Sequence, residues 1–270
     1  MPYWLDQSLI IFSLALSALI VGVLLNALIK RYPVKLFRQW KVECEEFLAQ
    51  YDEGPLENDP GASTALSCQH CHQKLSPWHN IGLFSLLIFA HRCEHCRERL
   101  TLRPIIVELT CLLLMLILYH HVGLTWQLPI LLVLTWTLVV IAFIDLDHQL
   151  ILDNVVIPFL WCGLLLNCVN IFTPLPLAVL GAVVGYLAIY LPAKAYQAWR
   201  KTPGVGMGDA KLLAALGAWL GIYVIPYLII GGFVMALLLF LFRLFVYRIN
   251  QPLPFAPCLT LITYYLILAN

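Results

Sequence analysis

The chain has 270 residues, of which 61% are hydrophobic and only 11% are charged, and its mean hydropathy is +0.86. These values lie far outside the range of soluble globular domains. The formal net charge of +1 at pH 7 gives no electrostatic reason to expect a nucleic-acid partner. The composition therefore indicates an all-α polytopic membrane protein that is surrounded by a lipid bilayer.

Apolar segments recur along the chain at the length that a membrane span needs, which is about 20 mostly apolar residues. We expect about eight transmembrane helices from these segments. They cover roughly residues 8–29, 105–119, 127–144, 155–173, 176–193, 210–224, 226–247 and 253–269. A single helix over residues 210–242 would be about 50 Å long, which exceeds a hydrocarbon core of about 30 Å. A break is therefore expected near Gly221 and Pro226.

The distribution of Lys and Arg predicts the topology. All sixteen basic residues lie in or close to residues 30–104, 145–154, 194–209 and 243–252, which are alternate connections between spans. Cytoplasmic connections carry the excess of basic residues, so we expect these connections in the cytoplasm and the N-terminus outside. No basic stretch precedes the first span and no small-residue cleavage site follows it, so we expect this helix to be retained.

Composition divides the chain into three parts. Residues 1–30 are predicted to form the first transmembrane helix, residues 31–104 are the only long polar segment, and residues 105–270 are predicted to form a seven-helix membrane domain. We expect the polar segment to be a small cytoplasmic domain. Such a segment has too little apolar core to be stable on packing alone.

Two Cys-x-x-Cys pairs in the polar segment predict a zinc site, because their spacing is typical of four-thiolate zinc domains. The predicted ligands are Cys68, Cys71, Cys93 and Cys96. Two disulfides are the alternative, but a reducing cytosol favours thiols and a bound metal. The nearby His70, His72 and His95 are alternative ligands. We expect a structural zinc that holds the segment together.

Carboxylates occur where predicted spans meet the cytoplasm. The segment FIDLDHQLILD holds Asp145, Asp147 and Asp153 at the end of the third span and the start of the fourth, and Asp209 opens the sixth. The third span runs inward and the sixth runs outward, so Asp145 and Asp209 lie at the same depth and could meet. Two carboxyl groups that share a site cannot both ionise cheaply, so such a pair can act as general base and general acid on a water. This is the chemistry of aspartic proteases.

Three glycines precede Asp209 in the sequence GVGMGD. We expect Gly204, Gly206 and Gly208 to permit backbone conformations closed to other residues and to let a substrate backbone approach. The dipole of the following helix favours an ionised Asp209, which makes Asp145 the protonated partner. Ordinary helix capping is the alternative role for Asp209.

Taken together, these residues resemble the bacterial type IV prepilin peptidases, and the resemblance covers nearly the whole chain. It rests on six segments in order. They are LLNALIKRYP, the four cysteines, RERLTLRPIIVELTCLLL, FIDLDHQLILDNVVIP, GMGDAKLLAALGAWLG and PLPFAPCLTL. The chain differs from the usual family pattern at Leu24-Leu25, at Ile151 to Asp153 and at Ala256, and none of these positions is an inferred catalytic acid.

The resemblance implies an intramembrane aspartic endopeptidase whose catalytic pair is Asp145 and Asp209. It implies cleavage of prepilin or pseudopilin leaders after a Gly on the cytoplasmic side, followed by methylation of the new N-terminal amine from S-adenosylmethionine. It also implies the bacterial inner membrane, with the zinc domain and both acids facing the cytoplasm. The residues expected to support the pair or bind substrate are Gly206, Gly208, Lys211, Asp147 and Asp153.

Three other classes of protein are weaker interpretations. An ion-coupled transporter could use the two acids as a proton relay, but it would show hydropathy repeats and broken helices near the bilayer midplane. A presenilin-type peptidase shares the GxGD sequence, but it lacks the tetracysteine insert and carries a Pro-Ala-Leu segment that is absent near this C-terminus. A membrane scaffold would leave both acids unexplained.

Overall fold

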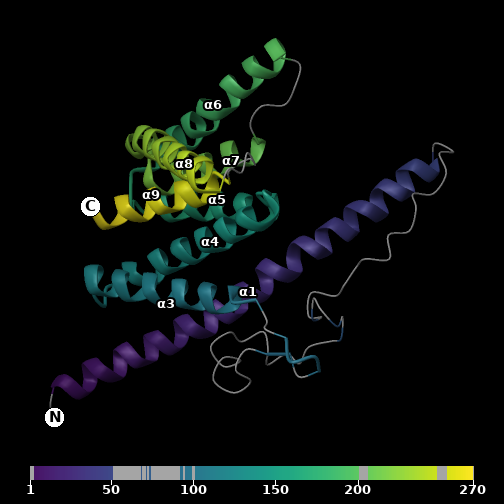
Figure 1. Cartoon of the computed structure of the whole chain (residues 1–270). Helices are drawn as coiled ribbons and strands as arrows, with labels where there is room; N and C mark the ends of the chain where they lie inside the picture. Colours follow the sequence, from purple (N-terminus) through teal and green to yellow (C-terminus); the bar gives the residue numbers. More distant parts are fainter. Residues whose placement is uncertain are drawn as a thin grey trace. The chain divides into compact units, whose positions relative to one another are not determined.

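The computed structural model describes residues 3–50, 68, 71, 73, 92–93, 95–98, 101–200, 206–247 and 254–269 (Figure 1). Over these residues the chain forms eight α-helices and one short 3-10 helix. The chain divides into two compact units, Met1–Leu128 and Pro129–Asn270. The expected all-α architecture is therefore confirmed. Most of the predicted polar segment and Gly204 lie outside the described residues.

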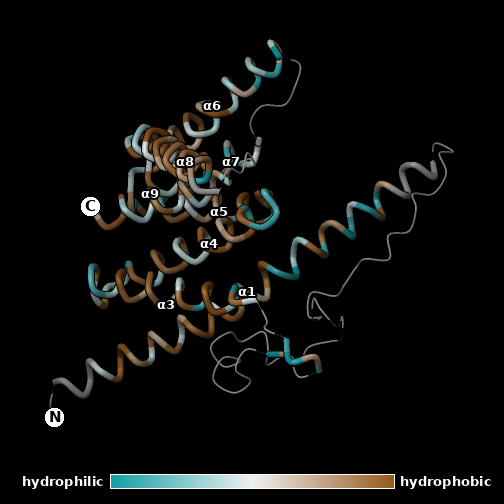
Figure 2. The backbone as a smooth tube through the Cα atoms, viewed as in Figure 1, coloured by the Kyte–Doolittle hydropathy of each residue, from teal (hydrophilic) through white to brown (hydrophobic). Residues whose placement is uncertain are grey.

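The first unit contains helices α1 (Tyr3–Gln50) and α3 (Arg103–Val122), which pack against each other. Helix α1 has 48 residues, which corresponds to about 72 Å, more than twice the thickness of a hydrocarbon core. It passes through Pro33 and continues well beyond the predicted end of the first span. Figure 2 shows that its N-terminal part is mainly apolar and its C-terminal part more polar.

Close packing of α1 on α3 depends on Gly22. A Cβ atom at Gly22 would lie 3.0 Å from the Cα of Glu108, so the two helices have room only for a hydrogen at this point. Two polar side chains are almost completely buried in this unit, Asn26 on α1 and Glu108 on α3. Sequence inspection did not single out Glu108, although an ionisable residue in a span is costly and hence informative.

The second unit contains the remaining helices, which follow the predicted apolar segments closely. They are α4 (Gln127–His148), α5 (Asp153–Asn167), α6 (Leu175–Arg200), α7 (Met207–Leu220), η2 (Ile222–Val224), α8 (Ile225–Tyr247) and α9 (Ala256–Ala269). The predicted break is confirmed, because α7 ends before Gly221, whose φ of 86° ends the helix.

Five helices of the described chain are long and apolar enough to cross a membrane. These are α1, α3, α4, α6 and α8, the last together with η2. Helices α5 and α9 are apolar but shorter, and α7 has 14 residues, which corresponds to about 21 Å.

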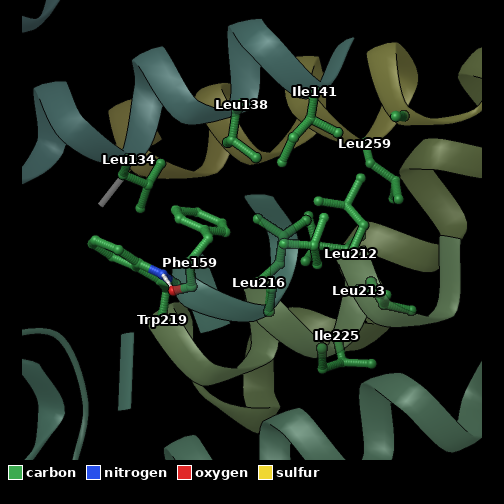
Figure 3. Packing of buried hydrophobic residues seen from close by; sticks show 14 residues of the cluster. Leu134, Leu138, Ile141, Phe159, Leu212, Leu213, Leu216, Trp219, Ile225 and Leu259 are labelled. Atoms are coloured by element: carbon green, nitrogen blue, oxygen red, sulfur yellow. Dashed lines mark hydrogen bonds between the residues drawn. The ribbon is translucent and has the colours of Figure 1, made fainter. Parts of the chain in front are cut away.

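Helix α7 lies in the core of the second unit, because nearly all of its side chains from Ala210 to Trp219 are buried. Figure 3 shows Leu212 and Leu216 on one side of α7, with Trp219 near its end. A helix that is buried on all sides needs apolar residues around its whole circumference, and the sequence AKLLAALGAWL supplies them except at Lys211.

Helices α6 and α7 touch backbone to backbone. A Cβ atom at Gly181 would lie 2.6 Å from the carbonyl oxygen of Gly217, and a Cβ at Gly217 would meet the carbonyl of Gly181. One turn away, a Cβ at Gly185 would lie 2.7 Å from the carbonyl oxygen of Leu213. Small residues four positions apart are the usual means of bringing membrane helices this close. This contact fixes α7 against α6.

The other side of α7 is held by α5. The ring of Trp219 stacks on Phe159 with 5.0 Å between ring centroids, and its Nε1 donates a hydrogen bond of 2.7 Å to the Phe159 carbonyl (Figure 3). Gly163 leaves the space that the indole occupies. The buried amide of Asn167 donates to the carbonyls of Ala218 and Trp219, at 2.8 and 2.9 Å. These contacts satisfy free carbonyls at the end of α7 and orient the helix whose other end carries Asp209.

Candidate active site and candidate metal centre

Asp145 lies in the last turn of α4 and only 5% of its surface is exposed. Its Oδ2 accepts a hydrogen bond of 3.0 Å from the backbone N–H of Ala256, the first residue of α9. The backbone amide of Phe255 also interacts with this carboxyl group. The end of α4 is therefore joined to the beginning of α9 by a buried carboxyl group.

Asp209 is the third residue of α7 and is partly buried. Its carboxyl group lies within electrostatic range of Asp145, so the two acids that the sequence paired belong to one cluster. The N-cap position of α7 is Gly206, and the helix has no side-chain cap hydrogen bond. Ordinary N-capping therefore does not account for Asp209.

The two described glycines of the GMGD turn differ in their roles. Gly208 packs on the connection between α4 and α5, where an added Cβ would lie 2.7 Å from the Cβ of Ile151. Gly206 has φ −64° and ψ 128°, a conformation open to any residue, and a Cβ there would meet only the Asp209 carboxylate, at 3.6 Å. The expectation of an unusual backbone conformation is therefore wrong for Gly206, whereas Gly208 is required for close packing.

Lys211 and Asp153 form an ion pair between α7 and the first residue of α5. The Nζ of Lys211 lies 2.7 Å from Oδ1 and 2.6 Å from Oδ2 of Asp153. The two side chains are 34% and 50% exposed, so solvent screens the pair and its contribution is at most about 1 kcal/mol. Together with the Gly208 contact, it aligns the first turn of α7 with the connection that follows Asp145. Asp147 is exposed and lies on a different face of α4 from Asp145.

This cluster can perform acid–base chemistry on a water molecule. A buried carboxyl group held by backbone amides lies within electrostatic range of a second one that is partly buried. Because like charges at short range disfavour double ionisation, such a pair carries one proton and can accept and donate protons in one reaction.

The four predicted cysteines come together, with all of their sulfur atoms within 4.8 Å of one another. Cys68 Sγ lies 3.7 Å from Cys96 Sγ, and Cys71 Sγ lies 3.8 Å from Cys93 Sγ. A disulfide would need about 2.05 Å. Four sulfurs about 2.3 Å from a tetrahedral zinc lie about 3.8 Å apart, so these thiols fit such an ion.

The two Cys-x-x-Cys turns share one backbone hydrogen bond. The N–H of Cys68 donates to the carbonyl of Gln73 at 2.9 Å, and the N–H of Cys93 donates to the carbonyl of Glu98 at 2.9 Å. Each turn therefore closes by a bond to the fifth residue after its first cysteine. This repetition indicates two equivalent halves of one four-thiolate site.

Sequence reasoning missed the role of the α9 N-terminus. The segment PLPFAP predicts a helix start, since Pro is favoured in the first turn. Nothing local in the sequence indicates that the amide of Ala256 meets Asp145, because the two residues are 111 positions apart in the chain.

Comparison with known proteins identifies the family to which this architecture belongs. Residues 132–241 match the type IV leader peptidase family, and residues 16–122 match the bacterial peptidase A24 N-terminal domain. The first match includes most of α4 and all of α5 to α7, with both acids. The second includes most of α1, all of α3 and the four cysteines. No solved structure matches the chain.

Curated relatives named prepilin leader peptidase/N-methyltransferase resemble the chain over most of its length. The relative from Stutzerimonas stutzeri is 38% identical over 90% of this chain and 85% of its own. The relative from Pseudomonas aeruginosa is 36% identical over 91% and 86%, and the one from Neisseria gonorrhoeae is 38% identical over 80% and 76%. The protein is a multi-pass inner-membrane enzyme, and the chain belongs to the type IV leader peptidase family.

Proposed function

We propose that the protein cleaves the leader from type IV prepilins or type II secretion pseudopilins, with Asp145 and Asp209 as its catalytic pair. The observation that carries this proposal is the placement of both acids at helix ends of one unit. Asp145 is buried against the beginning of α9, and Asp209, in the first turn of α7, lies within electrostatic range of it. The names of the relatives support the substrate class. The burial of Asp145 supports its role, because an ionisable side chain at a membrane helix end is costly unless it is used.

The pair would hydrolyse the peptide bond that follows a Gly residue. One carboxylate accepts a proton from water while the water oxygen attacks the carbonyl carbon, and the protonated partner donates its proton to the carbonyl oxygen. The tetrahedral diol then collapses, the first acid gives its proton to the leaving amine, and the second recovers a proton from the diol. The pair returns to its initial state without a covalent intermediate.

The new N-terminal amine is then methylated, with S-adenosylmethionine as the methyl donor. The names of the relatives support this second activity. The ammonium form of the new N-terminus must first lose a proton. The neutral amine would then take the methyl group from the sulfonium, and S-adenosylhomocysteine would be released. The two reactions act on the same end of the mature pilin.

Zinc bound by the four thiolates stabilises the turns in the first unit, as the spacing of their sulfur atoms supports. Because all four positions of a tetrahedral ion would be protein ligands, the ion is structural and leaves no site for water. The N-terminus lies outside, and the cysteines and both acids face the cytoplasm, where the basic connections are found.

Leader cleavage by single Asp variants tests the catalytic pair. Asp145→Asn and Asp209→Asn are assayed with a prepilin in membranes, and mass spectrometry measures both the loss of the leader and the added methyl group. We expect neither variant to cleave. Glu43→Gln is the control, because it removes an exposed carboxylate from α1 that has no assigned role in the site, and we expect it to cleave normally. Cleavage by Asp145→Asn or Asp209→Asn would contradict the assignment.

A further inference from the structure

The hydrogen bond between Ala256 and Asp145 distinguishes the two acids. A backbone N–H can only donate, so Oδ2 of Asp145 is the acceptor, and a negative charge on this carboxyl group strengthens the bond. This amide opens α9, where the unpaired N–H groups and the helix dipole give a partial positive charge. Both effects favour the ionised form of Asp145 and act against its burial, which favours the neutral form. They oppose the expectation from the sequence, in which Asp209 was the ionised member.

The amide of Ala256 cannot easily turn away, because α8 holds the beginning of α9. A Cβ at Gly232 would lie 2.9 Å from Leu259 Cδ2 and 3.3 Å from Phe255 Cζ, so α9 approaches the backbone of α8 closely. The side chains of Ala256 and Leu259 are completely buried. The donor is thus part of a packed element, whose geometry is set before a substrate binds.

The surroundings of Asp209 differ from those of Asp145. Asp209 is less deeply buried than Asp145, and Asp145 is a charged neighbour of its carboxyl group. Among the described residues, the titratable groups that interact with Asp145 include Asp209 on α7 and Cys258 on α9. Of these, Asp209 is the carboxyl group that can share a proton with Asp145, and an anionic Asp145 leaves that proton on Asp209.

We propose that the N-terminus of α9 holds Asp145 as the general base and that Asp209 is the general acid. The proposal rests on the catalytic pair assigned above and adds the direction of proton transfer. Asp145 accepts a proton from water as the water oxygen bonds to the carbonyl carbon, and the Asp209 proton moves to the carbonyl oxygen. On collapse of the diol, Asp145 returns its proton to the leaving amine and Asp209 takes one from the diol. The Ala256 amide is a positioning group, because it acts through Asp145.

Removal of this single N–H tests the proposal. Ala256→Pro deletes the donor at a helix start, where proline is tolerated, and Ala256→Gly keeps it. Both purified variants are assayed for leader cleavage against pH. The free energy of a hydrogen bond to a charged group corresponds to a fall of about 10- to 100-fold in kcat, which we expect for Ala256→Pro. KM should stay within about threefold of the parent value. The acid limb of its pH profile should move to higher pH, so that part of the activity returns in alkaline buffer.

Three outcomes separate the interpretations. Unchanged kcat and pH profile in Ala256→Pro would overturn the role of α9, even where Asp145→Asn and Asp209→Asn abolish cleavage. Cleavage by those Asn variants would instead overturn the catalytic pair itself. If Ala256→Pro does not fold, Gly232→Val replaces it, because a larger residue there pushes on Leu259 and Phe255. A shift of its acid limb to higher pH would support the proposal, and an unshifted limb would refute it.

Discussion

Replacement of Gly208 by alanine should impair catalysis by moving the helix that carries Asp209. The added Cβ would lie 2.7 Å from the Cβ of Ile151, about 0.7 Å short of an ordinary contact of 3.4 Å. Both atoms are attached directly to the backbone, so the turn and the α4–α5 connection must separate. Overpacking of this kind costs about 1–3 kcal/mol. A displacement approaching 1 Å of a catalytic group lowers the rate by about 100-fold.

The matched control is Gly206→Ala, two residues earlier in the same turn. Its Cβ would have a contact of 3.6 Å with the Asp209 carboxylate, and its backbone is already in a conformation that alanine adopts. We expect kcat for leader cleavage within about threefold of the parent for Gly206→Ala and about 100-fold lower for Gly208→Ala. In Gly208→Ala, Ile151→Gly should restore much of the activity because it removes the opposing Cβ. Equal effects of the two alanine variants, or no effect of Gly208→Ala, would refute this reasoning.

Three further changes test other parts of the structure. Cys68→Ser with Cys71→Ser should remove two of four zinc ligands, so elemental analysis of the purified protein should show less than one-tenth of the parental zinc; an unchanged zinc content would exclude this site. Lys211→Met should lower the free energy of unfolding by only about 0.2–1 kcal/mol. In a double-mutant cycle, Asp153→Asn should cause little further loss of stability in the Lys211→Met background, and additive effects would show that the pair is not coupled. Asn167→Leu should cost about 2–4 kcal/mol, because it leaves buried carbonyls at the end of α7 without donors, and a melting temperature in detergent equal to the parent's would contradict this estimate.

Local patterns were sufficient to predict most helices and the candidate metal ligands. Apolar segments recur at α3 to α9, and the break at Gly221 follows from a residue that readily adopts positive φ. The extension of α1 to Gln50 was missed, because the prediction followed apolar residues and this stretch is polar. Its Lys, Arg, Gln and Glu residues are nevertheless good helix formers.

Contacts between distant segments could not be predicted in the same way. The predicted topology puts Asp145 and Asp209 at one depth, and their electrostatic interaction agrees with this. The amide that holds Asp145 belongs to the backbone of Ala256, whose methyl side chain is neither polar nor titratable. The residue type at position 256 therefore does not predict this contact. The role of Gly208 depends on Ile151, which lies in a connection whose path no local pattern determines.

The contact between α6 and α7 also limits how this part of the sequence can change. Where a side chain opposes a glycine, a second substitution can make room for a larger residue. Gly181 and Gly217 each face the backbone carbonyl group of the other instead. A second substitution changes only a side chain, so it cannot remove the backbone atoms that would clash. A methyl group at either position could be accommodated only if the helices moved apart, with the loss of contacts along their whole length. We therefore expect substitutions at these two positions to lack single-site suppressors, unlike substitutions at Gly231, which faces the side chain of Ile262.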